Sequence, residues 1–190
     1  GFTTLLTVTE DSGFTGSKSD VAKVGSAIQL DNSYVLLPGE SGDFPSTPDS
    51  AALSFTADID LRFIIAADDY TPGSNQALGA QWDSSSNCSW AVLIGNGFLV
   101  LRTSPDGTEA SLVEAIASSA LTTTDGDKIA LKITRDMNNG ASGNDTKFWT
   151  SAEYDPSADT GTWTPLGTTV TNSGTTRIFD GNQPIRLGTY

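Results

Sequence analysis

Residues 58–65 carry the pattern that most limits the folds open to this chain. One set of alternating positions is apolar and the other is mostly charged: Ile59, Leu61, Phe63 and Ile65 against Asp58, Asp60 and Arg62. A period of two places the apolar side chains on one face of an extended strand and the charged ones on the other. The alternation therefore predicts a half-buried antiparallel strand whose charged face lies in solvent.

The same alternation returns further along the chain, and turn formers separate the runs. Asn96-Gly97 stands between two apolar runs, as in a tight hairpin whose two central residues need positive φ. Residues 112–121 are the one segment that would fit a helical turn. About ten to twelve short strands at this spacing predict an all-β fold in which two antiparallel sheets pack as a sandwich. The expected core is the set of apolar residues in phase: Ile59, Leu61, Phe63, Trp90, Val92, Ile129, Leu131 and Ile133.

The 190 residues fit one domain, because all-β sandwiches use that length in one piece. No proline-rich linker, repeat or change of composition marks a second domain. Residues 1–24 are more polar and less patterned than the rest. We therefore expect an N-terminal arm or a first edge strand over 1–24, and the sandwich over 25–190.

The composition excludes several classes of function. Histidine is absent and Cys88 is the single cysteine, so Ser-His-Asp or Cys-His catalysis, imidazole-bound zinc and intrachain disulfides are ruled out. Ten Lys and Arg against 23 Asp and Glu give a net charge of −13, which opposes binding to nucleic acid and to acidic membrane surfaces. No apolar run approaches the ~18 residues of a membrane span. We predict neither a nucleic-acid partner nor membrane insertion.

Several phrases of the sequence resemble a known family. Residues 23–31 and 34–37 resemble the opening strands of laminin-G-like, concanavalin A-like jelly-roll domains. Residues 147–151 with 162–167 resemble the C-terminal hairpin of the same domains. The resemblance implies a two-sheet antiparallel jelly-roll sandwich. Residues 153–161 lengthen the turn of that hairpin, so we expect this insert to project from the rim.

The Thr/Asp-rich, histidine-free style and the phrase at 58–62 look most like domains of tailed-bacteriophage virion proteins. Such proteins are commonly minor tail or capsid decoration components. The resemblance implies a structural or accessory role on the particle rather than a particular chemistry, because sandwich folds host many unrelated functions.

Glycoside hydrolysis is the first enzymatic chemistry to test, since some jelly rolls cleave glucans. It needs two carboxylates ~5–9.5 Å apart across the scissile bond, and the Glu-x-Asp-x-x-Glu motif of the jelly-roll glycanases is missing here. Glu109 and Glu114 are five positions apart, which on a regular strand turns them to opposite faces. Asp58 and Asp60 share a face, but Arg62 and cross-strand cations would neutralise them there. We predict no catalytic residues and no enzyme activity.

Loops rich in Asp, Asn and Gly offer the oxygen ligands that Ca²⁺ takes in proteins. The candidate ligands are Asp125 and Asp127 in one loop, and Asp136, Asn138 and Asp145 in another. Neither loop has the EF-hand spacing. Asp and Asn also favour turns for a local reason, because they hydrogen-bond their own backbone. Calcium is the one cofactor the composition favours, and both interpretations stay open.

Aromatic side chains provide the other candidate site. Sugars present flat apolar faces, so an exposed Trp or Tyr on a sheet or a rim loop can serve as a platform for them. Trp90 is in phase with the core, and Trp163 is expected to pack the C-terminal hairpin. The candidate carbohydrate-binding residues are therefore Trp82, Trp149 and Tyr154.

Three classes of function compete. The first is a non-enzymatic virion protein, made in the host cytoplasm and displayed on the particle, whose partners are other virion proteins and host-surface glycans. The high negative charge and the single cysteine suit this role, since copies must stay soluble and fold without disulfides. The alternatives are a secreted bacterial carbohydrate-binding module and, disfavoured by the missing motif, a glycanase. The sequence leaves the oligomeric state open, a homo-oligomer included.

Overall fold

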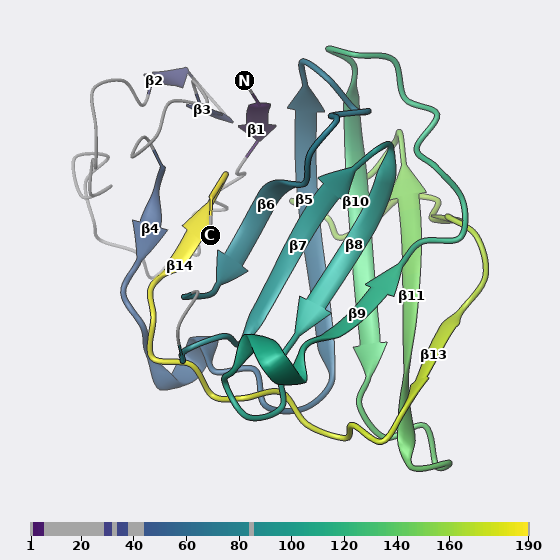
Figure 1. The fold of residues 1–190 in the computed structure, drawn as a ribbon. Coiled ribbons are helices and arrows are strands. Elements are labelled where there is room, and N and C mark those ends of the chain that lie inside the picture. Colours follow the sequence, from purple (N-terminus) through teal and green to yellow (C-terminus); the bar gives the residue numbers. More distant parts are fainter. Residues whose placement is uncertain (1, 6–28, 32–33, 38–43, 84–85, 190) are drawn as a thin grey trace.

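The computed structural model describes all residues except 1, 6–28, 32–33, 38–43, 84–85 and 190. Two antiparallel sheets pack face to face (Figure 1). The described residues form no α-helix, and their only helical turns are two short 3₁₀ segments, η1 (Ala51–Leu53) and η2 (Glu109–Ser111). No helix in this part of the chain is long and apolar enough to cross a membrane. The predicted two-sheet β-sandwich is confirmed.

Each sheet joins strands that are far apart in the sequence. The eight strands of sheet A run in the order β12 (Thr164–Pro165), β11 (Gly143–Ser151), β10 (Lys128–Asp136), β5 (Ile59–Ala67), β1 (Phe2–Leu5), β3 (Tyr34–Leu37) and β2 (Gln29–Asp31), with β13 (Val170–Ser173) also paired to β11. Sheet B has the order β4 (Ser46–Thr47), β14 (Ile185–Leu187), β6 (Gln76–Gln81), β7 (Trp90–Gly95), β8 (Phe98–Thr103) and β9 (Val113–Ile116).

The core lies between the sheets and contains every residue assigned to it from the alternation. Ile59, Trp90, Val92, Leu131 and Ile133 are buried, and Leu61, Phe63 and Ile129 are partly buried and pack against them. Burying each large apolar side chain contributes about 1.5–3 kcal/mol. The core therefore follows from the period-two pattern.

Sheet B is also apolar on its outer face. The odd positions of β7 join a second cluster with residues of β6, of β8 and of the connection between β6 and β7: Ala77, Ala80, Trp82, Cys88, Ala91, Leu93 and Val100. Because β7 is buried on both faces, its sequence is a continuous apolar run rather than a clean alternation.

The Asn96-Gly97 hairpin forms as predicted, between β7 and β8, with φ of 49° and 84° at its two central residues. Residues 112–121 are not helical; the strand β9 takes up residues 113–116 of this segment.

The structure describes only residues 2–5 of the N-terminal segment 1–24. Residues Phe2–Leu5 form β1, which pairs on one side with β3 and on the other with β5. These residues are therefore an interior strand of sheet A and neither an arm nor an edge strand. The rest of the expected arm lies outside the described residues.

Candidate functional site

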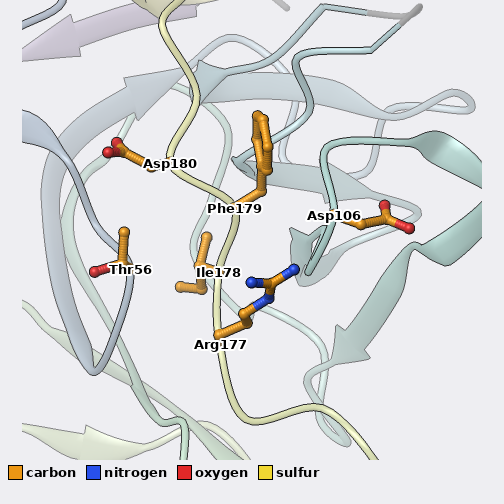
Figure 2. A pocket seen from close by; sticks show the side chains of 6 residues that line it. All are labelled: Thr56, Asp106, Arg177, Ile178, Phe179 and Asp180. Atoms are coloured by element: carbon orange, nitrogen blue, oxygen red, sulfur yellow. The ribbon is translucent and has the colours of Figure 1, made fainter.

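A pocket of about 340 Å³ opens at one end of the sandwich, lined by Thr56, Asp106, Arg177, Ile178, Phe179 and Asp180 (Figure 2). Its side chains do not converge on a common point: the carboxylates of Asp106 and Asp180 point to opposite sides. The ring of Phe179 lies against the α-carbon of Gly107, where an added Cβ would come within 2.9 Å. The pocket is a gap between loops and offers no paired carboxylates for catalysis.

Asp106 holds the loop at the edge of this pocket together. One of its oxygens accepts hydrogen bonds from the hydroxyls of Ser111 and Ser104 and from the hydroxyl and backbone N–H of Thr108. These donors, with Ser111 contributing most, lower the pKa of Asp106 to about 2. The carboxylate acts as a structural acceptor for its own loop.

We expect the contribution of Asp106 to stability to be lost in acid. A carboxyl group with a lowered folded-state pKa stabilises the fold above its unfolded pKa near 3.8, and that stability disappears as the pH falls through about 2. Asp106→Asn should therefore lower the urea midpoint at pH 7, and the difference from wild type should shrink between pH 4 and pH 2. Asp180→Asn, an exposed neighbour, is the control and should change neither value. A constant deficit across that pH range would contradict the assignment.

The outward face of sheet A carries a denser group of functional side chains. Four residues lie in one row across neighbouring strands: Arg62 on β5, Lys132 on β10, Trp149 on β11 and Pro165 on β12. The first three alternate along their strands with core residues, so the row faces away from the core. The row places two cations side by side, next to an indole ring.

Two adjacent cations on one sheet face repel each other unless each has its own partner. Arg62 is bound by carboxylates: its Nε and Nη2 donate to the two oxygens of Asp60 at 2.9 and 3.0 Å, and its Nη1 donates to Asp159. The hydrogen bonds that Arg62 donates to Asp60 and Tyr154 raise its pKa further above the ordinary value. Arg62 is thus fully compensated within the protein.

Lys132 is compensated differently. Its Nζ lies 4.5 Å from the ring centroid of Trp149 and 4.6 Å from that of Trp163. Among the described residues, no carboxylate lies within ion-pair distance of it. A cation between two indole faces is stabilised by the quadrupoles of the rings, by about 0.5–2 kcal/mol per ring.

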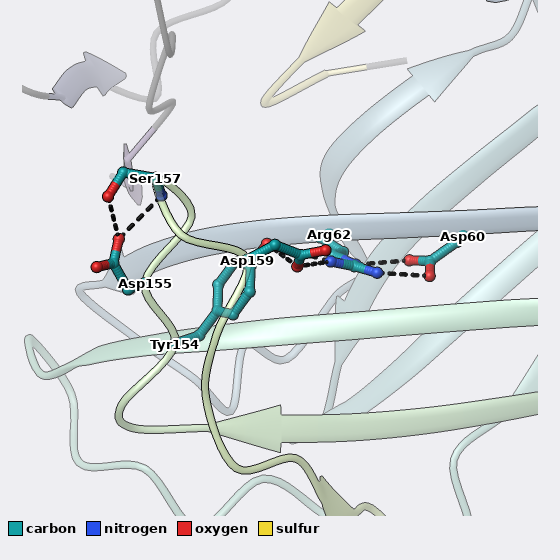
Figure 3. A network of polar contacts seen from close by, with 6 residues as sticks. All are labelled: Asp60, Arg62, Tyr154, Asp155, Ser157 and Asp159. Carbon is teal, nitrogen blue, oxygen red and sulfur yellow. Dashed lines mark hydrogen bonds and ion pairs between the residues drawn. The ribbon is translucent and has the colours of Figure 1, made fainter.

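The segment between β11 and β12 folds back over this row. The ring of Tyr154 packs on that of Trp163, with the two ring centroids 4.9 Å apart. The Tyr154 hydroxyl accepts a hydrogen bond from Arg62 at 3.2 Å and donates one to Asp159 at 3.1 Å (Figure 3). The segment is closed by a bridge between Asp155 and Thr160. The insert does not project freely from the rim as expected, because its aromatic and acidic side chains find partners on the face of sheet A.

We call Arg62, Lys132, Trp149, Tyr154 and Trp163 the sheet A cluster. The three aromatic side chains and Lys132 are half-buried, so each ring keeps an exposed part. Packing and cation–π contacts hold the rings in place, which lowers the entropy lost when a ligand stacks on them. The arrangement is suited to binding a flat, amphipathic ligand and contains no nucleophile with an adjacent base.

The candidate sugar-binding residues have different outcomes. Trp149 and Tyr154 both belong to the sheet A cluster. Trp82 does not lie exposed at the rim: it is 3% exposed, belongs to the second apolar cluster and directs its Nε1 toward Glu109. Sequence reasoning missed Lys132 and Trp163 as members of the site. Lys132 alternates with the apolar residues Leu131 and Ile133, and this alternation indicated that its side chain faces away from the core.

The candidate calcium ligands are split between opposite ends of β10. Asp125 and Asp127 precede the strand, where Asp125 accepts from the backbone of Tyr70 at 2.9 Å. At the other end Asp136 accepts from the backbone of Asn138, and Asp145 accepts from Asn139 and Thr171. In the described part of the chain, no group of three or more His, Cys, Asp or Glu side chains could hold a metal. Asp125, Asp136 and Asp145 thus accept hydrogen bonds from other parts of the protein, and calcium binding stays a prediction.

No protein-family model matches the sequence, and no curated protein matches it. The fold is similar to two solved toxin structures. The binding domain of botulinum neurotoxin serotype G has a TM-score of 0.58 at 12% identity, over 90% of this chain and 40% of that one. The binding domain of Paraclostridial Mosquitocidal Protein 1 has a TM-score of 0.51 at 16% identity, over 100% of this chain and 47% of that one.

The chain thus spans less than half the length of either toxin structure. At these identities the similarity shows a shared all-β sandwich and nothing more specific. The class of protein that the fold defines is a β-sandwich domain of the architecture found in those binding domains.

Proposed function

We propose that this chain is a non-enzymatic carbohydrate-binding domain and that the sheet A cluster is its binding surface. The observation that carries the proposal is the pair of half-buried indoles, Trp149 and Trp163, held on an outward sheet face by the ammonium of Lys132 between them. Pyranose rings present C–H faces that pack on indoles while their hydroxyls stay in water. Trp and Tyr suit such contacts because they combine an apolar ring with a polar group.

Two further observations favour binding over catalysis. Both toxin structures compared above are binding domains by name. Glu109 and Glu114, the glutamates weighed for glycoside hydrolysis, contact structural partners: Glu109 accepts from Trp82, and Glu114 accepts from Arg102 at 2.8 Å. Neither lies in the sheet A cluster.

The particle setting is part of the same proposal. Display on a bacteriophage virion, as a tail or decoration component, is supported by the style of the sequence, its net charge of −13 and its single, buried cysteine. A secreted carbohydrate-binding module is the alternative. Mass spectrometry of purified particles distinguishes the two, because only the virion protein copurifies with capsid and tail proteins at constant stoichiometry.

The binding proposal is tested on a glycan array, followed by calorimetry with the best oligosaccharide. Trp149→Ala should weaken binding by about 30-fold or more, the effect expected of an aromatic side chain at the centre of a binding surface. Phe44→Ala is the matched control. Phe44 is also a half-buried ring beside a cation, because Cζ of Arg186 lies 5.4 Å from its ring centroid, but it lies next to sheet B rather than sheet A. Equal affinity of wild type and the folded Trp149→Ala variant would overturn the assignment of the site.

A further inference from the structure

We infer that the glycan bound by the sheet A cluster carries an anionic group, a carboxylate or a sulfate, and that the ammonium of Lys132 binds it. This inference rests on the proposed function and adds the chemical class of the ligand. It begins from the difference between the two cations in the row. Arg62 has two carboxylate partners, whereas the partners of Lys132 among the described residues are ring faces.

The ammonium of Lys132 has unused hydrogen-bonding capacity. It carries three N–H donors, and the faces of Trp149 and Trp163 provide no oxygen acceptor for any of them. Lys132 is half-buried, so its charge is partly removed from water. An anionic oxygen that reaches it would form a charge-assisted hydrogen bond, which is shorter and stronger than a neutral one.

The distribution of charge supports the same ligand class. The chain as a whole carries −13, yet four of its ten Lys and Arg residues face outward on three adjacent strands of sheet A: Arg62, Lys128, Lys132 and Lys147. Asp60 and Asp159 are committed to Arg62, and Asp145 accepts from Asn139 and Thr171. Lys132 is the cation of this group that lies against the indole rings, where a stacked ligand would meet it.

The distances suit one sugar unit. The Nζ of Lys132 is 4.5 Å and 4.6 Å from the two indole centroids. We expect a pyranose that packs on the exposed part of either indole to bring a carboxylate or sulfate substituent of that sugar close to this atom. A neutral sugar would gain only the stacking contact.

The test compares three sets of oligosaccharides by calorimetry: galacturonic acid oligomers, the same oligomers after reduction of the carboxyl groups, and galactose oligomers sulfated at O6. Wild type should bind at least one anionic set about tenfold or more tighter than the neutral set. Lys132→Met should weaken binding of the preferred anionic set to the level of the neutral set, and so remove that preference. Lys132→Arg should keep it. The carboxylate and sulfate sets identify which group is recognised.

Lys128→Met is the matched control, because it removes the same charge from the same strand and face, four residues away. It should preserve the preference. If wild type binds all three sets with equal affinity, and Trp149→Ala weakens that binding, the inference of an anionic ligand is overturned. The carbohydrate-binding proposal is then retained. Equal weakening of neutral and anionic sets in Lys132→Met would also overturn the inference of an anionic ligand, by showing that Lys132 only positions the rings. Absence of binding to every glycan tested on the array and in calorimetry would overturn both proposals.

Discussion

Replacing Asn144 by leucine is expected to lower the free energy of unfolding by about 3–5 kcal/mol, because it removes the main acceptor of a buried charge. Arg135 is 1% exposed, between the two sheets. Its Nε and Nη2 both donate to Oδ1 of Asn144, at 2.9 and 2.7 Å, and its Nη1 donates to Thr103 at 2.8 Å. Burial lowers the pKa of Arg135 to about 10, and within the described residues no carboxylate pairs with it.

Urea denaturation of wild type, Asn144→Leu and the double variant Arg135→Met/Asn144→Leu measures this effect. The double variant should recover most of the loss, since an apolar pair of similar volume replaces both the charge and its acceptor. The double variant also lacks the hydrogen bond that Asn144 donates to the backbone carbonyl of Thr175 at 3.0 Å. The stability contributed by this bond is not recovered. A double variant as unstable as the single one would show that the buried charge is not the source of the loss.

The second large effect is expected at Gly167, the residue that follows the buried Leu166 after β12. Its φ is +88°, and a Cβ there would lie 2.2 Å from Oγ of Ser118 and 2.9 Å from the backbone nitrogen of Ser119. The left-handed conformation costs a non-glycine residue about 1–2 kcal/mol, and forcing the two segments apart costs about 1–3 kcal/mol more. Gly167→Ala should therefore lower the free energy of unfolding by about 2–4 kcal/mol, measured by urea denaturation.

Gly174→Ala separates the two contributions. Gly174 has nearly the same φ, +84°, but nothing lies within 4 Å of an added Cβ. This variant should show only the conformational cost of about 1–2 kcal/mol. Equal losses in the two variants would mean that the segment at 118–119 moves aside at no cost, and that the close approach seen at Gly167 contributes little to stability.

Local patterns in the sequence were sufficient for strands such as β5, β7 and β8 and for the core residues assigned from them. The alternation at 58–65 predicted both the strand β5 and its two faces, because a strand has no other way to separate apolar from charged side chains. The Asn96-Gly97 turn was equally local, since positive φ at both positions is a property of those two residues. The same local reasoning excluded histidine- and disulfide-based chemistry without any structure.

The neighbours of each strand could not be obtained in this way. The position of β1 between β3 and β5 depends on pairings between residues more than 30 positions apart, and its short, weakly patterned sequence carried no signal of them. Arg135 continues the alternation of Leu131 and Ile133 and so points toward the core, but a charged residue at that position predicts that the buried part of the strand has ended. Its burial requires Asn144 and Thr103, which come from two other strands in two different sheets.

The sheet A cluster shows the same division. The sequence by itself determined that Trp149 is out of phase with Phe148, and that Asp60 and Arg62 face solvent. Only the tertiary structure decided that Lys132 stands between Trp149 and Trp163, and that Tyr154 returns to the same face. The physical reason is that a strand's own pattern sets which side chains leave its two faces, whereas their neighbours are set by strand order and register. Those are chosen by the free energy of the whole sandwich, through core burial and backbone pairing summed over many distant residues.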